Sequence, residues 1–330
     1  MAVDLRVVTP DRFGNLLQHL TGSKAHNTHL RELAVRRGLH VSEYGIRDDA
    51  DGTVTHCTTE AQVYARLGLP YIEPELREDR GELDPGWEPP PLVTEADLRG
   101  ELHCHTRLSD GRATLAEMAE AARRRGLEYL AITDHSASHG FGNHVTPDRL
   151  WARIEEIREW NRGKRGFRLL AGSEINIGLD GSLDYPEDLV AELDWVVASV
   201  HTSFSISEAE MTGRVLAAIE NPDVHCIGHL TGRLIGRREP YGIDVEAVAE
   251  AAARTGTILE INGNPNRRDL SDRHARLAAE AGAPIVLNTD AHGVDTLDNM
   301  RYAVATARRA WLTRADVANT RPWARFKQLL

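Results

Sequence analysis

The most constraining feature of this chain is a set of metal-ligand side chains placed at the ends of short apolar segments. They occur in the segments ELHCHT, LSDG, ITDHS, AGSEI, ASVHT, IGHLT and NTDAH, and they are His103, His105, Asp110, His135, Glu174, His201, His229, Asp290 and His292. Apart from the Asp110 loop, each segment closes an apolar run that predicts a β-strand. Because the carboxyl ends of parallel strands meet at one end of a barrel, we expect the nine side chains to converge there.

The number of these side chains predicts more than one metal ion. A four-coordinate catalytic zinc takes three protein ligands and keeps one open position, so nine ligands predict two or three ions held side by side. Six imidazoles favour zinc, manganese or iron over calcium, which prefers oxygen ligands.

Each histidine taken singly is more often a hydrogen-bonded core or surface residue than a ligand. The pattern as a whole is different. The pairs His103 and His105, and Asp290 and His292, are each spaced by two residues, which puts both side chains of a pair on the same face of an extended chain. We therefore interpret the set as a metal centre.

The second half of the chain alternates strand and helix patterns. Six of the seven predicted strands carry a proposed ligand at or just past the carboxyl end, whereas an open doubly wound sheet would gather ligands only near its switch point. The prediction is an α/β fold, a closed seven-stranded (β/α) barrel with its site at the C-terminal mouth. The strands are predicted at residues 98–103, 129–133, 168–175, 195–200, 226–229, 257–261 and 284–289.

Other polar residues near these strand ends are candidates for supporting roles. The sixth strand, TILEING, offers no clear ligand, and we expect Glu260 and Asn262 beside the site. Asp134 could orient a neighbouring imidazole, and Asn288 could support Asp290. A guanidinium on the loops after strands five and six would suit a phosphate, although a surface ion pair is as good an interpretation for any one of them. The arginines on these loops are Arg233, our first candidate, and Arg237, Arg238, Arg267 and Arg268.

An acidic, proline-rich stretch predicts a domain boundary. The residues EPELREDRGELDPGWEPPPLVTEAD have no helical or alternating pattern, so we expect a linker over 73–96 between a first segment, 1–72, and a barrel domain, 97–330. In the first segment we expect a strand at DLRVV, a helix after Thr9, a second helix from Ser23 to Gly38, a strand at LHVSEYGI and a short helix at TEAQVYARLG.

Composition limits the setting and the partners. The net charge of −11 opposes a bulk electrostatic grip on nucleic acid but leaves room for a local arginine cluster. No apolar run approaches twenty residues, so no membrane partner is expected. The first residues have no signal-peptide pattern and the three cysteines form no CxxC pair, which together favour a reducing, cytoplasmic location.

The motifs resemble a known domain. HCHTRLSDG, ITDHS, the strand-end Glu174, VHT, GHLTGR and NTDAH are similar in order and spacing to the polymerase and histidinol phosphatase (PHP) domain over about residues 97–330. The resemblance implies a distorted seven-stranded barrel with a trinuclear centre. By position it implies His103, His105, Glu174 and Asp290 for the first ion, Glu174 with His201 and His229 for the second, and Asp110, His135 and His292 for the third.

The first segment resembles the end of the palm and the thumb of a bacterial family X DNA polymerase. The similar stretches are VDLRVV, LLQHLTGSKAHNTHLRELAVRRGLHVSEYGI and VYARLGLPYIEPELREDRGE. Asp4 falls where the third palm aspartate would be, and the two earlier ones are absent. One aspartate cannot hold two ions for nucleotidyl transfer, so we expect no polymerase activity from this chain. A separate polymerase or repair protein is the protein partner that this implies.

Together these observations predict a metal-dependent phosphoesterase acting on DNA 3′ ends, as a 3′–5′ exonuclease or a 3′-end-processing enzyme in DNA repair. Glu174, Asp134 and Arg233 are its expected catalytic residues. The alternative is a phosphatase on a small phosphomonoester such as histidinol phosphate or a nucleotide.

Two further classes are weaker. Amidohydrolase barrels commonly bridge their metals through a modified lysine, and the only lysines here, Lys24, Lys164 and Lys327, are not at strand ends. A barrel kept only to brace a polymerase would predict missing ligands, and none is missing.

Overall fold

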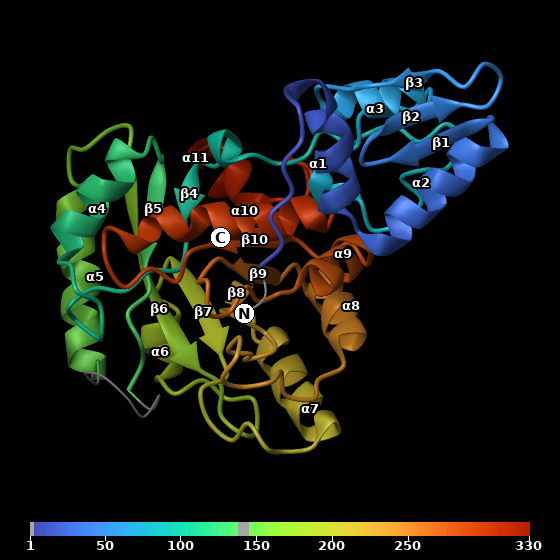
Figure 1. The fold of residues 1–330 in the computed structure, drawn as a ribbon. Coiled ribbons are helices and arrows are strands. Elements are labelled where there is room, and N and C mark those ends of the chain that lie inside the picture. Colours follow the sequence, from blue (N-terminus) through green and yellow to red (C-terminus); the bar gives the residue numbers. More distant parts are fainter. Residues whose placement is uncertain (1–2, 138–144) are drawn as a thin grey trace. The chain divides into compact units, whose positions relative to one another are not determined.

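The computed structural model describes residues 3–137 and 145–330, and the chain divides into two compact units (Figure 1). The N-terminal unit is Met1–Pro91 and the barrel unit is Leu92–Leu330. Within the described residues, no helix has both the length and the apolar content needed to cross a membrane.

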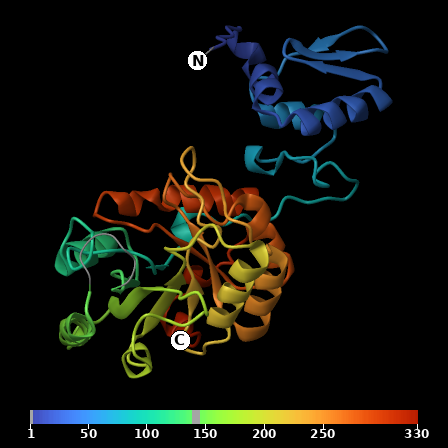
Figure 2. The same ribbon diagram turned by 90° about the horizontal axis from the view of Figure 1, so that it is seen from below.

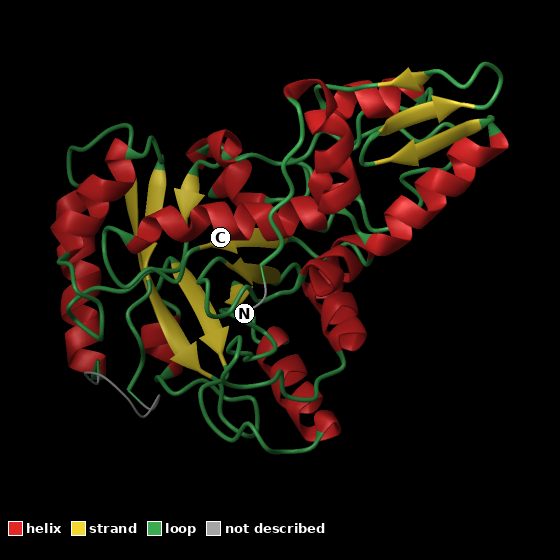
Figure 3. Ribbon diagram, in the orientation of Figure 1, coloured by secondary structure: helices red, strands yellow, loops and turns green. Residues whose placement is uncertain are grey.

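The barrel unit is built on a seven-stranded parallel sheet in which every strand lies beside its sequence neighbour (Figure 3). The strands β5, β7, β9 and β10 are buried along their whole length, as expected for parallel strands covered on both faces. The predicted fold class is therefore confirmed. The strands are β4 (Gly100–Glu101), β5 (Tyr129–Ile132), β6 (Arg168–Asn176), β7 (Trp195–Ser199), β8 (Cys226–Ile227), β9 (Ile258–Asn262) and β10 (Ile285–Asn288).

Hydrogen bonds near the ends of the two outermost strands, β4 and β10, bring the sheet close to a closed barrel. Just past the strand ends, the main-chain N–H of His105 donates to the carbonyl of Ala291 at 2.8 Å. Further down, the side-chain amide of Asn319 donates to the carbonyls of Gly100 and Leu287 at 2.8 and 2.7 Å. The ends of β4 and β10 are thus held together, which the metal site requires.

Amphipathic helices surround the strands (Figure 2). Helix α4 shows why such segments fold: Thr114 and Glu117 form a capping box, and Met118 and Ala122 on one face are buried. The helices of the barrel unit are α4 (Leu115–Arg124), α5 (Pro147–Asn161), α6 (Glu187–Val190), α7 (Glu208–Ile219), α8 (Val245–Thr255), α9 (Asp272–Glu280), α10 (Met300–Arg309) and α11 (Trp323–Phe326).

The last segment of the chain fills the barrel at the amino ends of its strands. Ala318 and Phe326 pack in one buried cluster with Tyr129 and Trp195, and the rings of Tyr129 and Phe326 stack with their centroids 4.6 Å apart. This end is therefore core, and the opposite end, at the carboxyl ends of the strands, is left for the polar residues.

The N-terminal unit combines three helices with a small antiparallel sheet of order β1-β2-β3. Ser23 caps the second helix by accepting a hydrogen bond from the N–H of His26, as its position in the sequence predicts. The segment LHVSEYGI, expected as one strand, is two strands joined by a tight turn between Ser42 and Gly45. The elements are α1 (Phe13–Thr21), α2 (Lys24–Arg36), β1 (Leu39–Ser42), β2 (Gly45–Asp48), β3 (Val54–Thr55) and α3 (Glu60–Arg66).

The strand predicted at DLRVV is wrong. Residues 3–9 carry no strand, and the side chains of Val3, Leu5 and Val7 are 81%, 85% and 85% exposed. Alternating apolar residues form a strand only when a neighbouring strand accepts their backbone hydrogen bonds, and no described strand of the chain does so.

The structure also differs from the expected linker over 73–96. Arg77 and Glu82 are fully buried in the N-terminal unit, where Arg77 pairs with Glu60 and Glu82 bonds the ring of His26 at 2.7 Å. The unit therefore continues to Pro91. Composition alone marks this stretch as polar, but it does not reveal which of its charges find a buried partner.

Candidate metal centre

The nine side chains singled out in the sequence lie together at the carboxyl ends of the barrel strands. Each has a ligand atom within 3.3 Å of another member of the set. His103 and His105 follow β4, Asp110 lies on the loop after them, His135 follows β5, Glu174 lies in β6, His201 follows β7, His229 follows β8, and Asp290 and His292 follow β10.

Glu174 is at the centre of the cluster. Its Oε2 lies 2.9 Å from Nδ1 of His135 and 3.3 Å from Nε2 of His103. Its Oε1 lies 2.8 Å from Nε2 of His229 and 3.2 Å from Nε2 of His201. The two oxygens of one buried carboxylate therefore face two different pairs of imidazoles, which is the arrangement a bridging ligand needs.

Three overlapping groups have ligand atoms close enough to share an ion. In each group these atoms all lie within 4.8 Å of one another. His105 joins two of the groups, and its ring stacks on those of His135 and His292, with centroids 4.4 and 4.3 Å away. The groups are His105, Asp110, His135 and His292; His103, His105 and Asp290; and His135, Glu174 and His201.

Several buried polar atoms of the cluster have no hydrogen-bond partner among the described residues, as expected of atoms that bind a metal. Nε2 of His103, Nδ1 of His105 and Oε2 of Glu174 are buried and make no hydrogen bond to the described residues. A buried polar atom without a hydrogen bond costs about 1–3 kcal/mol, and a coordinated cation removes that cost. This donor set fits divalent metal ions.

Two of the ligands also have an unusual backbone conformation. His229 and Asp290 have φ angles of 27° and 53°, in the left-handed region that residues with a β-carbon rarely adopt. Such conformations are held by the surrounding structure and occur often at functional sites. Here the N–H of His229 donates to Glu260 at 2.8 Å, which holds the turn.

The charges within the cluster separate its histidines into two classes. Burial and the neighbouring His292 and His135 lower the pKa of His105 to about 4, and burial lowers the pKa of His201 to about 4. For His135 burial acts in the same direction, but the carboxylates of Glu174 and Asp110 outweigh it and raise the pKa to about 10. The pKa of His292 is raised to about 9, because Asp110 and Asp290 outweigh burial in the same way.

Metal binding should therefore release protons. At pH 7.5 we expect His103, His135 and His292 each to hold a proton in the metal-free protein, because neighbouring carboxylates outweigh burial and raise the pKa of all three. An imidazole must give up this proton to bind a metal. Affinity should rise as the pH increases toward 9, because protons compete less. Calorimetric zinc titrations at pH 7.5 in buffers of different ionisation enthalpy should show about three protons released. Release of less than one proton would contradict this charge assignment.

Glu260, on β9, forms hydrogen bonds that hold residues of the cluster in position. Its Oε1 bonds Nδ1 of His103 at 2.6 Å, and Asn288 donates to the same oxygen at 3.0 Å. Its Oε2 accepts from Asn262 at 3.1 Å and from the N–H of His229. A carboxylate on one ring nitrogen fixes the orientation of the other, so Glu260 directs Nε2 of His103 into the cluster.

Among the described residues, Asp134 contacts a loop and no imidazole. It is 2% exposed and accepts hydrogen bonds from the N–H and hydroxyl of Thr106, both at 2.7 Å, and from the hydroxyl of Ser109 at 2.8 Å. These bonds hold the turn that leads into Asp110. The structure thus gives Asp134 a positioning role for that ligand.

The sequence predicted that Arg233 would lie at the site and bind phosphate. In the structure Arg267 is the arginine near the candidate ligands, and Arg233 holds the loop that carries it. The Nε of Arg233 donates to the carbonyl of Arg267 at 2.7 Å, and its Nη2 donates to that of Arg268. Arg233 therefore holds the loop after β9. The Nε of Arg267 lies 3.5 Å from Oδ2 of Asp290, so Arg267 is the guanidinium beside the ligands.

Two buried residues near the ligands were missed in the sequence. Glu101 accepts hydrogen bonds from the N–H groups of His103 and Thr289, and burial raises its pKa to about 7. Glu101 lies two residues before His103 and four before His105, so the three side chains share one face of the extended chain. This spacing could have identified Glu101 from the sequence. Arg214 on α7 donates to the carbonyls of Gly178 and Thr202 at 2.9 Å. Since Thr202 follows His201, Arg214 fixes that ligand loop, and no local sequence pattern predicts this.

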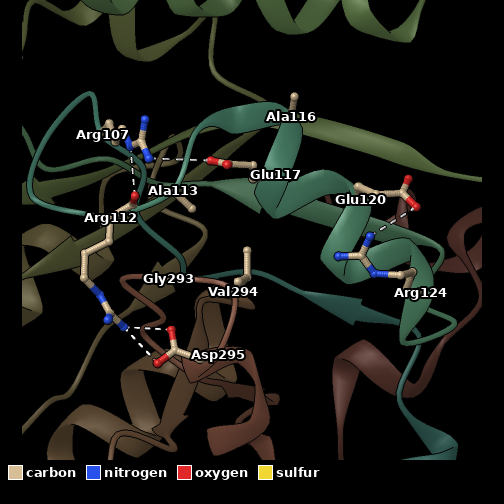
Figure 4. Close-up of a pocket in the computed structure, with 10 residues that line it drawn as sticks. All are labelled: Arg107, Arg112, Ala113, Ala116, Glu117, Glu120, Arg124, Gly293, Val294 and Asp295. Carbon is tan, nitrogen blue, oxygen red and sulfur yellow. Dashed lines mark hydrogen bonds and ion pairs between the residues drawn. The ribbon is translucent and has the colours of Figure 1, made fainter.

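One pocket is lined by residues that are close in sequence to two of the candidate ligands, Asp110 and His292 (Figure 4). The charged side chains that line it are paired with one another. Arg112 donates to both oxygens of Asp295 at 2.7 and 3.0 Å, and Arg124 lies 3.6 Å from Glu120. Exposed pairs of this kind contribute little binding energy, so we assign this pocket no role. It is lined by Arg107, Arg112, Ala113, Ala116, Glu117, Glu120, Arg124, Gly293, Val294 and Asp295.

Comparison with known proteins agrees with this geometry. The PHP domain model matches residues 101–264, and the DNA polymerase beta thumb model matches residues 16–78. The chain is 42% identical over 320 residues to the DNA polymerase/3′-5′ exonuclease PolX of Bacillus subtilis (strain 168), covering 97% of this chain but only 56% of that protein. It is 31% identical over 238 residues to a probable phosphatase of Syntrophotalea carbinolica, covering 66% of this chain and 90% of that protein.

Among solved structures, histidinol phosphate phosphatase from Lactococcus lactis, in complex with zinc, L-histidinol and phosphate, superposes with a TM-score of 0.46 at 17% identity, over 63% of this chain and 93% of that one. The family assignment rests on the sequence matches. The phosphatase relative is matched over nearly its whole length, and the PHP model covers strands β4 to β9. The chain belongs to the PHP family of metal-dependent phosphoesterases, with a segment of the DNA polymerase beta thumb family ahead of the PHP domain.

Proposed function

We propose that this chain hydrolyses phosphodiester bonds at DNA 3′ ends, as a 3′–5′ exonuclease or a 3′-end-processing enzyme in DNA repair. The observation that carries the proposal is the convergence of nine candidate metal ligands in the same chain as a thumb segment of a DNA polymerase family. The Bacillus relative, which shares both parts, bears the name of a 3′-5′ exonuclease.

We further propose that the cluster holds two to three ions of zinc, manganese or iron. The first would be held by His103, His105, Glu174 and Asp290, the second by Glu174, His201 and His229, and the third by Asp110, His135 and His292. Bound ions of this kind lower the pKa of a water molecule and neutralise charge on phosphate oxygens during in-line displacement.

The protein's own groups hold the substrate and the ligands. Arg267, beside Asp290, is placed to bind a phosphate oxygen through its guanidinium. Glu260 and Asp134 keep His103 and the Asp110 loop in position. Arg233 holds the backbone that carries Arg267.

Nucleotide addition is not part of the proposal. Asp4 lies in an exposed stretch without a strand. Synthesis would come from a separate polymerase or repair protein.

The alternative substrate is a small phosphomonoester, such as histidinol phosphate or a nucleotide. It is favoured by the Syntrophotalea relative, a probable phosphatase that this chain matches over 90% of its length. The two substrates place different demands on the mouth of the barrel, because only DNA continues beyond the scissile phosphate.

The test offers metal-loaded protein 5′-labelled single-stranded DNA, gapped DNA, histidinol phosphate and a nucleoside monophosphate in parallel. We expect DNA to shorten from its 3′ end, with kcat/KM at least about tenfold above that for either monoester. The Glu174→Gln variant, purified in the same way, controls for contaminating nuclease. Rapid turnover of a monoester with DNA left intact would overturn the proposal in favour of the phosphatase.

A further inference from the structure

An arginine guanidinium lies over an aromatic ring that is close in sequence to one of the candidate ligands. Phe204 is three residues beyond the ligand His201, and the guanidinium carbon of Arg238 lies 3.9 Å from the centroid of its ring. The rings of Phe204 and Tyr241 are nearly parallel, with an interplanar angle of 19° and centroids 6.1 Å apart. Arg238 also donates from Nε to the carbonyl of Gly232 at 2.8 Å, which fixes the plane of the guanidinium.

This stack is attached to the loops that carry the ligands. The hydroxyl of Tyr241 donates to the carbonyl of Leu230, which directly follows His229. Gly232, at a φ of 61°, leaves room for the ring, because a β-carbon there would lie 2.3 Å from Tyr241. The position of the stack relative to the cluster is therefore set by short covalent and hydrogen-bonded links.

A second guanidinium lies near the first. Arg267 lies beside Asp290. Burial lowers the pKa of Arg238, and the positive charge of Arg267 lowers it further, so the two guanidinium groups are within electrostatic range. Two cations within electrostatic range repel each other, and an anionic group near both relieves that repulsion. The pair is consistent with a substrate that brings a phosphate to Arg267 and a planar group to Arg238.

We propose that the face of the Arg238 guanidinium turned away from Phe204 is the stacking platform for the base of the 3′-terminal nucleotide. The inference rests on the proposed action at DNA 3′ ends, and it names the part of the substrate that is recognised. Guanidinium planes stack on nucleobases, and every base has a face to offer, so the platform selects for a base without selecting its identity. Because the contact with Phe204 and the hydrogen bond to Gly232 already restrain the guanidinium, little side-chain freedom is lost on binding.

The experiment pairs two substrates with matched variants of the full, metal-loaded chain. Two 5′-labelled oligonucleotides are identical except that the 3′-terminal nucleotide carries thymine in one and is an abasic tetrahydrofuran in the other. Wild type should remove the base-bearing nucleotide with about tenfold higher kcat/KM than the abasic one. Arg238→Lys keeps the positive charge but loses the plane. It should lose about tenfold on the base-bearing substrate and less than about threefold on the abasic one. Arg273→Lys, at an exposed position of α9, is the control and should keep the wild-type preference.

A binding measurement separates stacking from damage to the fold. An oligonucleotide with 2-aminopurine at its 3′ end and an uncleavable methylphosphonate terminal linkage should be quenched by wild type and far less by Arg238→Lys. Near-ultraviolet circular dichroism of the two proteins should coincide. Equal quenching by both proteins would overturn the inference.

The remaining outcomes are distinguishable. Equal cleavage of both oligonucleotides by wild type, or an equal loss on both in Arg238→Lys, overturns the base platform and leaves the proposed function standing. If wild type cleaves neither oligonucleotide but hydrolyses histidinol phosphate, the proposed function fails and the platform with it.

Discussion

Replacing Glu174 by glutamine should reduce hydrolysis by on the order of a thousandfold, because it removes a carboxylate whose two oxygens face different imidazoles. Glutamine has the same shape but presents an uncharged oxygen and an amide nitrogen. The amide nitrogen would point at an imidazole, where only an acceptor is useful. The second ion, which would be held by Glu174, His201 and His229, should be lost first.

Elemental analysis and turnover measure the two consequences separately. Wild type should carry two to three equivalents of transition metal, and Glu174→Gln at least one fewer. Glu246→Gln, an exposed residue in the first turn of α8, is the matched control and should behave as wild type. Unchanged turnover in Glu174→Gln would remove this residue from the site, and one equivalent or less in wild type after loading would end the trinuclear proposal.

Replacing Glu260 by glutamine should weaken metal binding by about 10- to 100-fold, the usual effect of removing a carboxylate behind a ligating histidine. Glu260 accepts from four donors, so one amide nitrogen in its place leaves at least one donor facing another donor. His103 would then lose the group that orients its ring.

The Glu260 effect differs in kind from that of Glu174. Because every proposed ligand is still present, excess metal should restore most of the activity of Glu260→Gln, and it should not restore Glu174→Gln. Competition with a chromophoric chelator measures the affinity. Glu280→Gln, at the exposed end of α9, is the control. An affinity equal to that of wild type would show that Glu260 acts only in packing.

The sequence predicted the structure best where a short repeating pattern determines which side chains share a face. Residues two apart on a strand share a face, and parallel strands in a barrel all end at one mouth. The spacing of His103 and His105, together with the positions of the strand ends, was therefore enough to predict which side chains would meet. The seven strands were found for the same reason, since continuous apolar runs bounded by turns are typical of buried parallel strands.

The same reasoning worked less well where the partner is distant in the sequence. Arg233 and Arg267 lie on different loops, and only the folded chain shows that the first binds the backbone of the second. Asp134 adjoins His135 in sequence, yet its hydrogen bonds go to Thr106 and Ser109. The sequence indicated that Arg77 and Glu82 belong to a charged linker. Their buried partners, Glu60 and His26, precede them by many residues and could not be recognised from the local sequence.

The closing contacts of the barrel also determine when the metal centre can form as the chain is synthesised. Asn319 joins Gly100 across 219 residues, and His105 meets Asp290 across 185. Contacts of such long sequence separation form late in folding. A ribosome must release almost the whole barrel before the first and last ligands can meet. Until then the exposed imidazoles are separate and bind ions weakly. The metal would therefore be acquired only once the barrel is nearly complete, unlike the zinc of a small finger domain, whose ligands lie close together in the sequence.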